Sequence, residues 1–180
     1  MSHGTTGTRQ SCPGDPPLIS HLRSPFLVKH WPILVIGITG VPLFLALIIE
    51  YMAGLVPCAL CLMQRVWMIA AGLIAVFAWI HATDNRFYPA LTATIAGIGA
   101  SFSIRHLYLQ TLPEHEAPSC GPDVDYMLQN FPLADVLLTM TRGTGDCAKV
   151  TSIVDVLFPV GALVILLLVI GLCAVRTFRR

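Results

Sequence analysis

Two of the six cysteines stand three positions apart, in the run Cys58-Ala59-Leu60-Cys61. This Cys-x-x-Cys spacing permits a small disulfide ring, and it occurs in redox proteins whose attacking thiol has a lowered pKa. Pro57 precedes the pair and an apolar run follows it. We therefore expect both thiols at a helix N-terminus, where backbone N–H groups and the helix dipole favour thiolate. The pattern predicts thiol–disulfide chemistry.

Arg65 follows Cys61 by four positions, which places both side chains on one face of a helix. An arginine just inside an apolar segment is costly and usually has a partner. Arg65 is therefore a candidate site residue. The alternative is that its side chain extends to the membrane interface and makes no particular contact.

Cys120 and Cys147 form a second pair, in a segment rich in glycine and proline. One interpretation is a static disulfide that staples a long loop. Another is a zinc site built from Cys58, Cys61, Cys120 and Cys147. Zinc sites more often combine two closely spaced ligand pairs, whereas the second pair here is 27 positions apart. We therefore expect no metal.

The elements that position these cysteines are membrane spans. Of the 180 residues 55% are hydrophobic and 12% are charged, with a mean hydropathy of +0.73. An ordinary soluble domain has about 25% charged residues, so that class is excluded. Four runs reach the roughly 20 apolar residues that cross a bilayer, and we place them at about 31–51, 62–82, 87–107 and 153–175. Pro42 should kink the first span without ending it. We predict an all-α, four-helix membrane bundle.

Basic residues near span ends mark the cytoplasmic side. Seven of the 11 basic residues lie on one predicted side: Arg9, Arg23, Lys29, Arg86, Arg176, Arg179 and Arg180. We therefore expect both termini in the cytoplasm. Residues 1–30 would be a poorly ordered leader, and residues 31–180 a single membrane domain. The outer loops, at about 52–61 and 108–152, would hold four of the six cysteines, where disulfides persist. Cys12 and Cys173 remain on the other side, with a structural or incidental role.

Two dithiol pairs on one face of a membrane can exchange electrons through mixed disulfides. Turnover then needs a terminal acceptor. The chain has no Gly-rich dinucleotide fingerprint, no haem attachment motif and no iron–sulfur cysteine spacing. By elimination, a lipid-soluble quinone is the acceptor that we expect. We expect no nucleic-acid partner.

The run from Gly54 to Arg65 closely resembles the disulfide bond formation protein B (DsbB) family, whose members carry Pro-Cys-x-x-Cys-x-x-x-Arg here. Three later segments resemble the family as well: His106-Leu107-Tyr108-Leu109-Gln110, Phe131-Pro132-Leu133 and Gly145-Asp146-Cys147-Ala148. The resemblance covers residues from about 44 to 158 and leaves the leader outside.

The resemblance implies a quinone-dependent thiol oxidase of the bacterial inner membrane, which reoxidises a periplasmic DsbA-like dithiol oxidase. The partner's thiolate would attack Cys120, and the released Cys147 would then attack Cys58. Cys61 would be the thiolate that faces ubiquinone or menaquinone. Arg65 would stabilise that thiolate and hydrogen-bond a quinone carbonyl, with His106 near the quinone.

Two other functions remain open. One is a vitamin K epoxide reductase-like enzyme, although such proteins place their Cys-x-x-Cys late in the bundle. The other is a non-enzymatic membrane scaffold with two static disulfides. Among single residues, Arg105 is an alternative quinone contact to His106, and Glu50 has no assigned role.

The second outer loop also contains a helical pattern. Apolar residues recur at helical spacing after Pro132: Leu133, Val136, Leu137 and Met140. We hypothesise that this short amphipathic helix lies on the membrane surface and lets Cys147 approach Cys58. Simple packing against the span ends is the alternative.

Overall fold

The computed structural model describes residues 30–54, 57–81, 85–113, 116, 124–148 and 153–178. Cys120, Cys12 and almost all of the predicted leader lie outside these residues. The described part is helical and contains no strand. Its elements are α3 (Trp31–Ala53), α4 (Ala59–His81), α5 (Phe87–Thr111), α6 (Val124–Asn130), α7 (Leu133–Arg142), the 3-10 turn η1 (Gly145–Cys147) and α8 (Ile153–Phe178).

Four of these helices, α3, α4, α5 and α8, are long and apolar enough to cross a membrane. The predicted all-α bundle of four spans is confirmed. α4 begins at Ala59 rather than at about 62, so its first turn contains Cys61. α3 continues through Pro42 and ends at Ala53. The next residue, Gly54, has a left-handed backbone (φ 62°), and its N–H caps the helix by donating to the Glu50 carbonyl.

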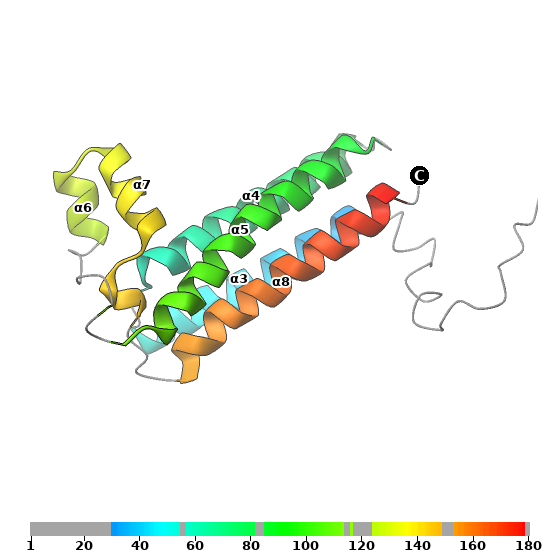
Figure 1. The fold of residues 1–180 in the computed structure, drawn as a ribbon. Helices are drawn as coiled ribbons and strands as arrows, with labels where there is room; N and C mark the ends of the chain where they lie inside the picture. Colours follow the sequence, from blue (N-terminus) through cyan, green and yellow to red (C-terminus); the bar gives the residue numbers. More distant parts are fainter. Residues whose placement is uncertain are drawn as a thin grey trace, which may run out of the picture.

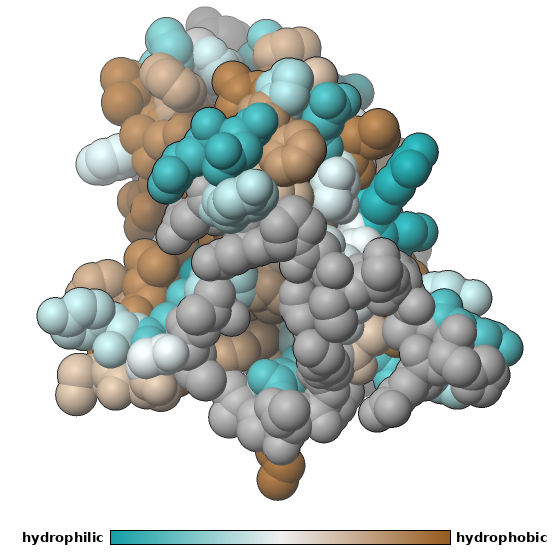
Figure 2. Space-filling model, turned by 90° about the vertical axis from the view of Figure 1, so that its left-hand side faces the viewer, coloured by the Kyte–Doolittle hydropathy of each residue, from teal (hydrophilic) through white to brown (hydrophobic). Residues whose placement is uncertain are grey.

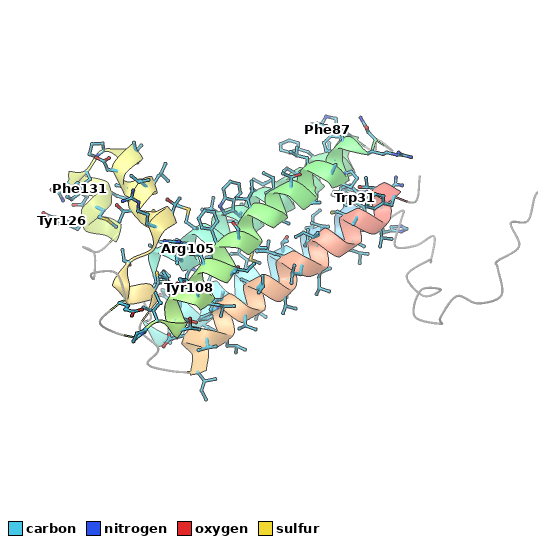
Figure 3. All side chains as sticks on the ribbon, in the orientation of Figure 1. Trp31, Phe87, Arg105, Tyr108, Tyr126 and Phe131 are labelled. Carbon is cyan, nitrogen blue, oxygen red and sulfur yellow. The ribbon has the colours of Figure 1, made fainter. Side chains whose placement is uncertain are left out.

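The four long helices lie side by side, and the shorter elements gather at one end of the bundle (Figure 1). We call this the cysteine end, because Cys58 and η1 are found there. Trp31, at the start of α3, and Phe87, at the start of α5, lie at the opposite end (Figure 3). α8 also ends at that opposite end (Figure 1). The described part of the chain thus starts and finishes at one end of the bundle.

Small residues allow close packing between the long helices. A Cβ atom on Gly99 of α5 would lie 2.9 Å from Trp67 Cβ and 3.2 Å from Leu166 Cδ1. Gly99 therefore lets α5 approach both α4 and α8, as small residues do in membrane bundles. Buried alanines of α4 and α5 belong to the same core cluster as Leu166: Ala75, Ala78, Ala96 and Ala100.

The outward faces of the long helices carry large apolar side chains. Phe44, Phe77 and Leu167 are each more than half exposed. A soluble protein would bury such residues, whereas a lipid bilayer solvates them. The bundle therefore positions the cysteine end at one boundary of an apolar layer.

Candidate redox site

The Cys58–Cys61 pair stands at the N-terminus of α4. The two sulfur atoms are 3.2 Å apart, and the Cys61 backbone N–H donates to Cys58 Sγ at 3.4 Å. An N–H group at a helix start is left without a carbonyl partner in its own helix, and it favours negative charge on an atom that accepts from it. The expected position of both thiols at a helix N-terminus is confirmed.

His106 of α5 lies against both thiols and is only 2% exposed. Its Nε2 is 3.7 Å from Cys58 Sγ, and its Nδ1 is 3.9 Å from Cys61 Sγ. The Gln64 amide nitrogen lies 3.3 Å from the same Nδ1. The ring is therefore held where it can exchange protons with the dithiol.

Cys147 approaches the pair from η1, on the second loop segment. Its side chain is 1% exposed and packs with Leu60, Leu109 and the partly buried Cys58. The hydrogen bond from its thiol to Cys58 and its burial both raise the pKa of Cys147 above the ordinary value. The structure thus brings Cys147 next to Cys58, the residue that it would attack in the predicted relay. Cys120, the other member of the second pair, lies outside the described residues.

Arg65 forms an ion pair with Glu50 of α3. Its Nη1 donates to Glu50 Oε2 at 2.7 Å, and its Nη2 donates to Oε1. The two side chains are 14% and 12% exposed. The interpretation in which Arg65 extends to the interface without a partner is therefore wrong.

A half-open pocket of about 200 Å³ lies beside Cys61, between α3, α4 and α8. Its polar wall consists of Cys61, Gln64 and Arg65, all from α4. The rest of the lining is apolar, for example Pro42 and Ala46 of α3 and Phe158 of α8. An apolar slot with a few polar groups on one wall is typical of a site for a small, mostly apolar ligand.

His106 and Arg105 are not among the residues that line this pocket. Arg105 is exposed and turns toward α7, as Figure 3 shows. Its Nε and Nη2 donate to the Arg142 carbonyl at 2.9 and 2.7 Å. Arg105 therefore holds the end of α7, and the pocket lies elsewhere. The suggestion that it could replace His106 as a quinone contact finds no support in this geometry.

The predicted helix after Pro132 is present as α7. Its Val136 and Met140 are buried against Ala59 and Met63 of α4, whereas Leu133 and Leu137 are exposed. The alternative, in which this helix packs against the end of a span, is thus correct for the face of α7 that carries Val136 and Met140. Figure 2 views this end of the molecule and shows hydrophobic and hydrophilic residues side by side on its upper part. Contact of the exposed face with the membrane stays a hypothesis.

Cys58, Cys61 and His106 also form a group that could hold a metal ion, since their ligand atoms lie within 4.8 Å of one another. Two thiolates and one imidazole are ligands that zinc accepts. This group differs from the four-cysteine site considered from the sequence, because it uses His106 and does not require Cys120.

Two residues at the site were missed by the sequence reasoning. The sequence assigned no role to Glu50, yet Glu50 holds Arg65. Gln64 was not a candidate, yet it contacts His106. A signal for Glu50 existed. It lies just before the end of one predicted span and Arg65 just after the start of the next, so antiparallel helices bring the two opposite charges to the same depth.

Comparison with known proteins assigns the chain to a family. The family model "Disulfide bond formation protein DsbB" matches residues 28–176. Two relatives, both called disulfide bond formation protein B, come from Marinobacter nauticus (44% identical over 111 residues) and Methylococcus capsulatus (46% over 108). Each alignment covers 66% of the relative, just under two thirds of its length, and 60% and 58% of this chain.

A third relative of the same name, from Acinetobacter baylyi, is 36% identical over 140 residues, which cover 75% of this chain and 82% of the relative. No solved structure matches the chain. The family model spans the four long helices and the cysteine end between them. The chain therefore belongs to the DsbB family of disulfide bond formation proteins.

Proposed function

We propose that this protein is a membrane dithiol:quinone oxidoreductase that reoxidises a DsbA-like thioredoxin-fold partner. The observation that carries the proposal is the order of groups around one dithiol. Cys147 packs against Cys58 on one side, and Cys61 lines the apolar pocket on the other. A dithiol that lies between another thiol and a half-open apolar pocket can take electrons from that thiol and deliver them to a ligand in the pocket.

The chain's own part begins at Cys120 and Cys147. The partner's thiolate attacks Cys120 of a Cys120–Cys147 disulfide and forms a mixed disulfide, which releases Cys147 as a thiolate. The second partner thiol then resolves the mixed disulfide, so the partner leaves oxidised. Cys147 attacks Cys58 of the Cys58–Cys61 disulfide and frees Cys61 as a thiolate. Cys120 next attacks Cys147, which restores Cys120–Cys147 and leaves Cys58 and Cys61 reduced. Two electrons and two protons have then moved from the partner to this pair.

The pocket residues fit a quinone. A quinone ring is flat and apolar and carries two carbonyl acceptors, and the pocket offers apolar walls with donors on Gln64 and Arg65. When bound, a quinone supplies a two-electron, two-proton sink. Cys61 stands nearest to that sink in the relay, and Arg65 provides a positive charge beside its thiolate. His106, in contact with both sulfurs, can accept the thiol protons one at a time and pass each of them on.

The setting that we propose is the bacterial inner membrane, with the cysteine end facing the periplasm. Four apolar helices and family membership support a multi-pass membrane protein. The basic residues at the opposite end favour its cytoplasmic placement. In that orientation the relay would sustain disulfide formation in exported proteins, with ubiquinone or menaquinone as the acceptor.

Purified full-length protein in detergent tests the proposal. It is mixed with a reduced DsbA-type protein and a soluble ubiquinone or menaquinone analogue, and quinone absorbance is followed. Wild type should reduce quinone, and Cys61→Ser and Cys120→Ser should each abolish the reaction. Cys173→Ser is the matched control, because Cys173 is buried in the apolar core of the bundle and belongs to neither pair.

Full activity of both site variants would refute the relay. A wild-type protein that is inert with every reduced thioredoxin-fold partner, while its disulfides stay intact, would favour the scaffold. Thiol trapping with mass spectrometry on the same samples distinguishes the two results, because a relay changes the pairing during the reaction and a scaffold does not.

A further inference from the structure

Glu50 has no part in the relay as described so far, although it forms an ion pair with Arg65. Glu50 belongs to α3 and Arg65 to α4, and two hydrogen bonds join their side chains. Both side chains are largely buried. A charge in this setting is costly unless it is paired, and a bidentate arginine–carboxylate contact is the geometry that compensates best. The pair therefore fixes the guanidinium in place.

The fixed guanidinium belongs to the wall of the pocket. Arg65 lines the pocket together with Cys61, and so does Ile49, the residue before Glu50. An arginine carries five N–H donors, and the carboxylate accepts from one on each Nη atom. Donors remain for an acceptor in the pocket.

We infer that Glu50 is a positioning residue, which holds the Arg65 guanidinium at the pocket wall so that it can bind the acceptor's carbonyl oxygen. This inference rests on the proposed quinone reaction. Arginine side chains near the end of a span otherwise extend toward the water interface. The carboxylate of α3 removes that freedom, and its charge makes the pair neutral overall in an apolar layer.

The first experiment measures quinone kinetics. Glu50→Gln keeps the shape of the side chain but loses the charge, so the KM for a soluble quinone should rise about tenfold, as expected for a lost charged hydrogen bond. Glu50→Asp should recover part of the loss. The mixed disulfide with the reduced partner, formed without quinone, should form at the wild-type rate. Asp135→Asn, which removes an exposed carboxylate of α7 away from the pocket, is the matched control.

A double-mutant cycle tests whether Glu50 acts through Arg65. In the Arg65→Gln background, Glu50→Gln should have no further effect on KM, because the group that it positions is gone. An equal rise of KM in both backgrounds would overturn the inference. So would an unchanged KM for Glu50→Gln in the wild-type background.

A second readout needs no quinone. Phenylglyoxal modifies free guanidinium groups, and mass spectrometry of the peptide that contains Arg65 reports the rate. Arg65 should react several-fold faster in Glu50→Gln than in wild type or Asp135→Asn, since a paired and buried guanidinium is protected. Equal rates would show that Glu50 does not hold Arg65, whatever the quinone assay gives. Arg65 could be modified faster in Glu50→Gln while the wild-type protein reduces no quinone. That result would refute the proposed function and, with it, the role of Glu50 and Arg65 in acceptor binding.

Discussion

At the scale of single residues, the site depends on one imidazole that contacts two sulfurs. His106 lies 3.7 Å from Cys58 Sγ and 3.9 Å from Cys61 Sγ, and it is nearly inaccessible. Oxidation of a dithiol releases two protons, and histidine is the side chain that exchanges protons most readily near neutral pH. The structure therefore places His106 with the thiols, whereas the sequence resemblance implied a place near the quinone.

Replacing His106 should slow electron transfer from the dithiol to quinone. We expect His106→Gln to lower the rate by roughly 10²-fold, which is the usual contribution of a general acid–base group. Stopped-flow quinone reduction in a single turnover measures it. His81→Gln is the control, because His81 ends α4 at the other end of the bundle and is exposed. Equal rates for the two variants would exclude a proton role.

The raised pKa of Cys147 predicts a pH-dependent relay. The nucleophile in thiol–disulfide exchange is the thiolate. The hydrogen bond to the reduced Cys58 and burial both raise the pKa of Cys147, and burial persists when Cys58 is part of a disulfide. The fraction of thiolate, and with it the exchange rate between the two pairs, should rise about tenfold for each pH unit while pH stays below that pKa. Acid-quenched thiol trapping at several pH values measures this rate. An exchange rate that does not change with pH above pH 7 would contradict this prediction.

The metal alternative at Cys58, Cys61 and His106 has its own test. We expect dialysis of the protein against a strong chelator to leave quinone reduction unchanged, because the redox reaction needs free thiolates. Atomic emission measurements before and after dialysis give the zinc content. One zinc per chain that is lost together with activity would favour a metal site over the dithiol relay.

At the scale of elements, α7 and η1 determine where Cys147 can be. α7 packs on the first turns of α4 through Val136 and Met140, and Arg105 of α5 holds its last carbonyl. Gly143 follows with a left-handed backbone (φ 80°), which glycine adopts without strain. The chain then reaches Cys147 within one turn, so the position of this thiol depends on the junction between α7 and η1.

Gly143→Ala should disturb that junction. A Cβ atom there would lie 2.8 Å from both Leu60 Cδ1 and Leu109 Cδ1, and the positive φ of this position costs a residue with a side chain about 1–3 kcal/mol. A displaced Cys147 should exchange with Cys58 roughly 10²-fold more slowly.

The same rapid thiol trapping follows this exchange. Quinone reduction driven by a small dithiol that reduces Cys58–Cys61 directly should stay near the wild-type rate. Gly171→Ala, where a Cβ meets nothing within 4 Å, is the control. Unchanged exchange in Gly143→Ala would show that the junction does not position the thiol.

At the scale of the whole molecule, the bundle is held by close contacts between small residues, while its large apolar side chains face outward. In lipid, helix association gains little free energy from the hydrophobic effect. Close packing between the helices must therefore supply the stabilisation. Gly99 lies where α4, α5 and α8 meet, against Trp67 and Leu166. The same packing keeps α4 and α5 in register, which brings His106 to the dithiol.

Gly99→Ala should therefore destabilise the bundle by about 1–3 kcal/mol, because the added methyl group overpacks the interface. Thermal unfolding in detergent, followed by circular dichroism, measures the loss. Gly97→Ala is a close control, since it lies two residues away on the same helix and a Cβ there meets nothing within 4 Å. Similar stability of the two variants would mean that the helices adjust freely at this point.

The sequence by itself determined the membrane class, the four spans and the dithiol at the start of a helix. Long uncharged runs and residue spacing are local properties, and they need no knowledge of which helices are neighbours. The helix after Pro132 was predictable for the same reason, as was the DsbB family from its motifs.

Only the tertiary structure decided which side chains meet across helices. Glu50 holds Arg65, His106 contacts both sulfurs, and Arg105 turns to α7 instead of the pocket. Each of these contacts joins residues 15 to 48 positions apart. These contacts depend on how each helix is rotated about its axis and how deep it lies in the bundle. The steric fit between whole helix faces sets both, and no single segment of the sequence encodes it.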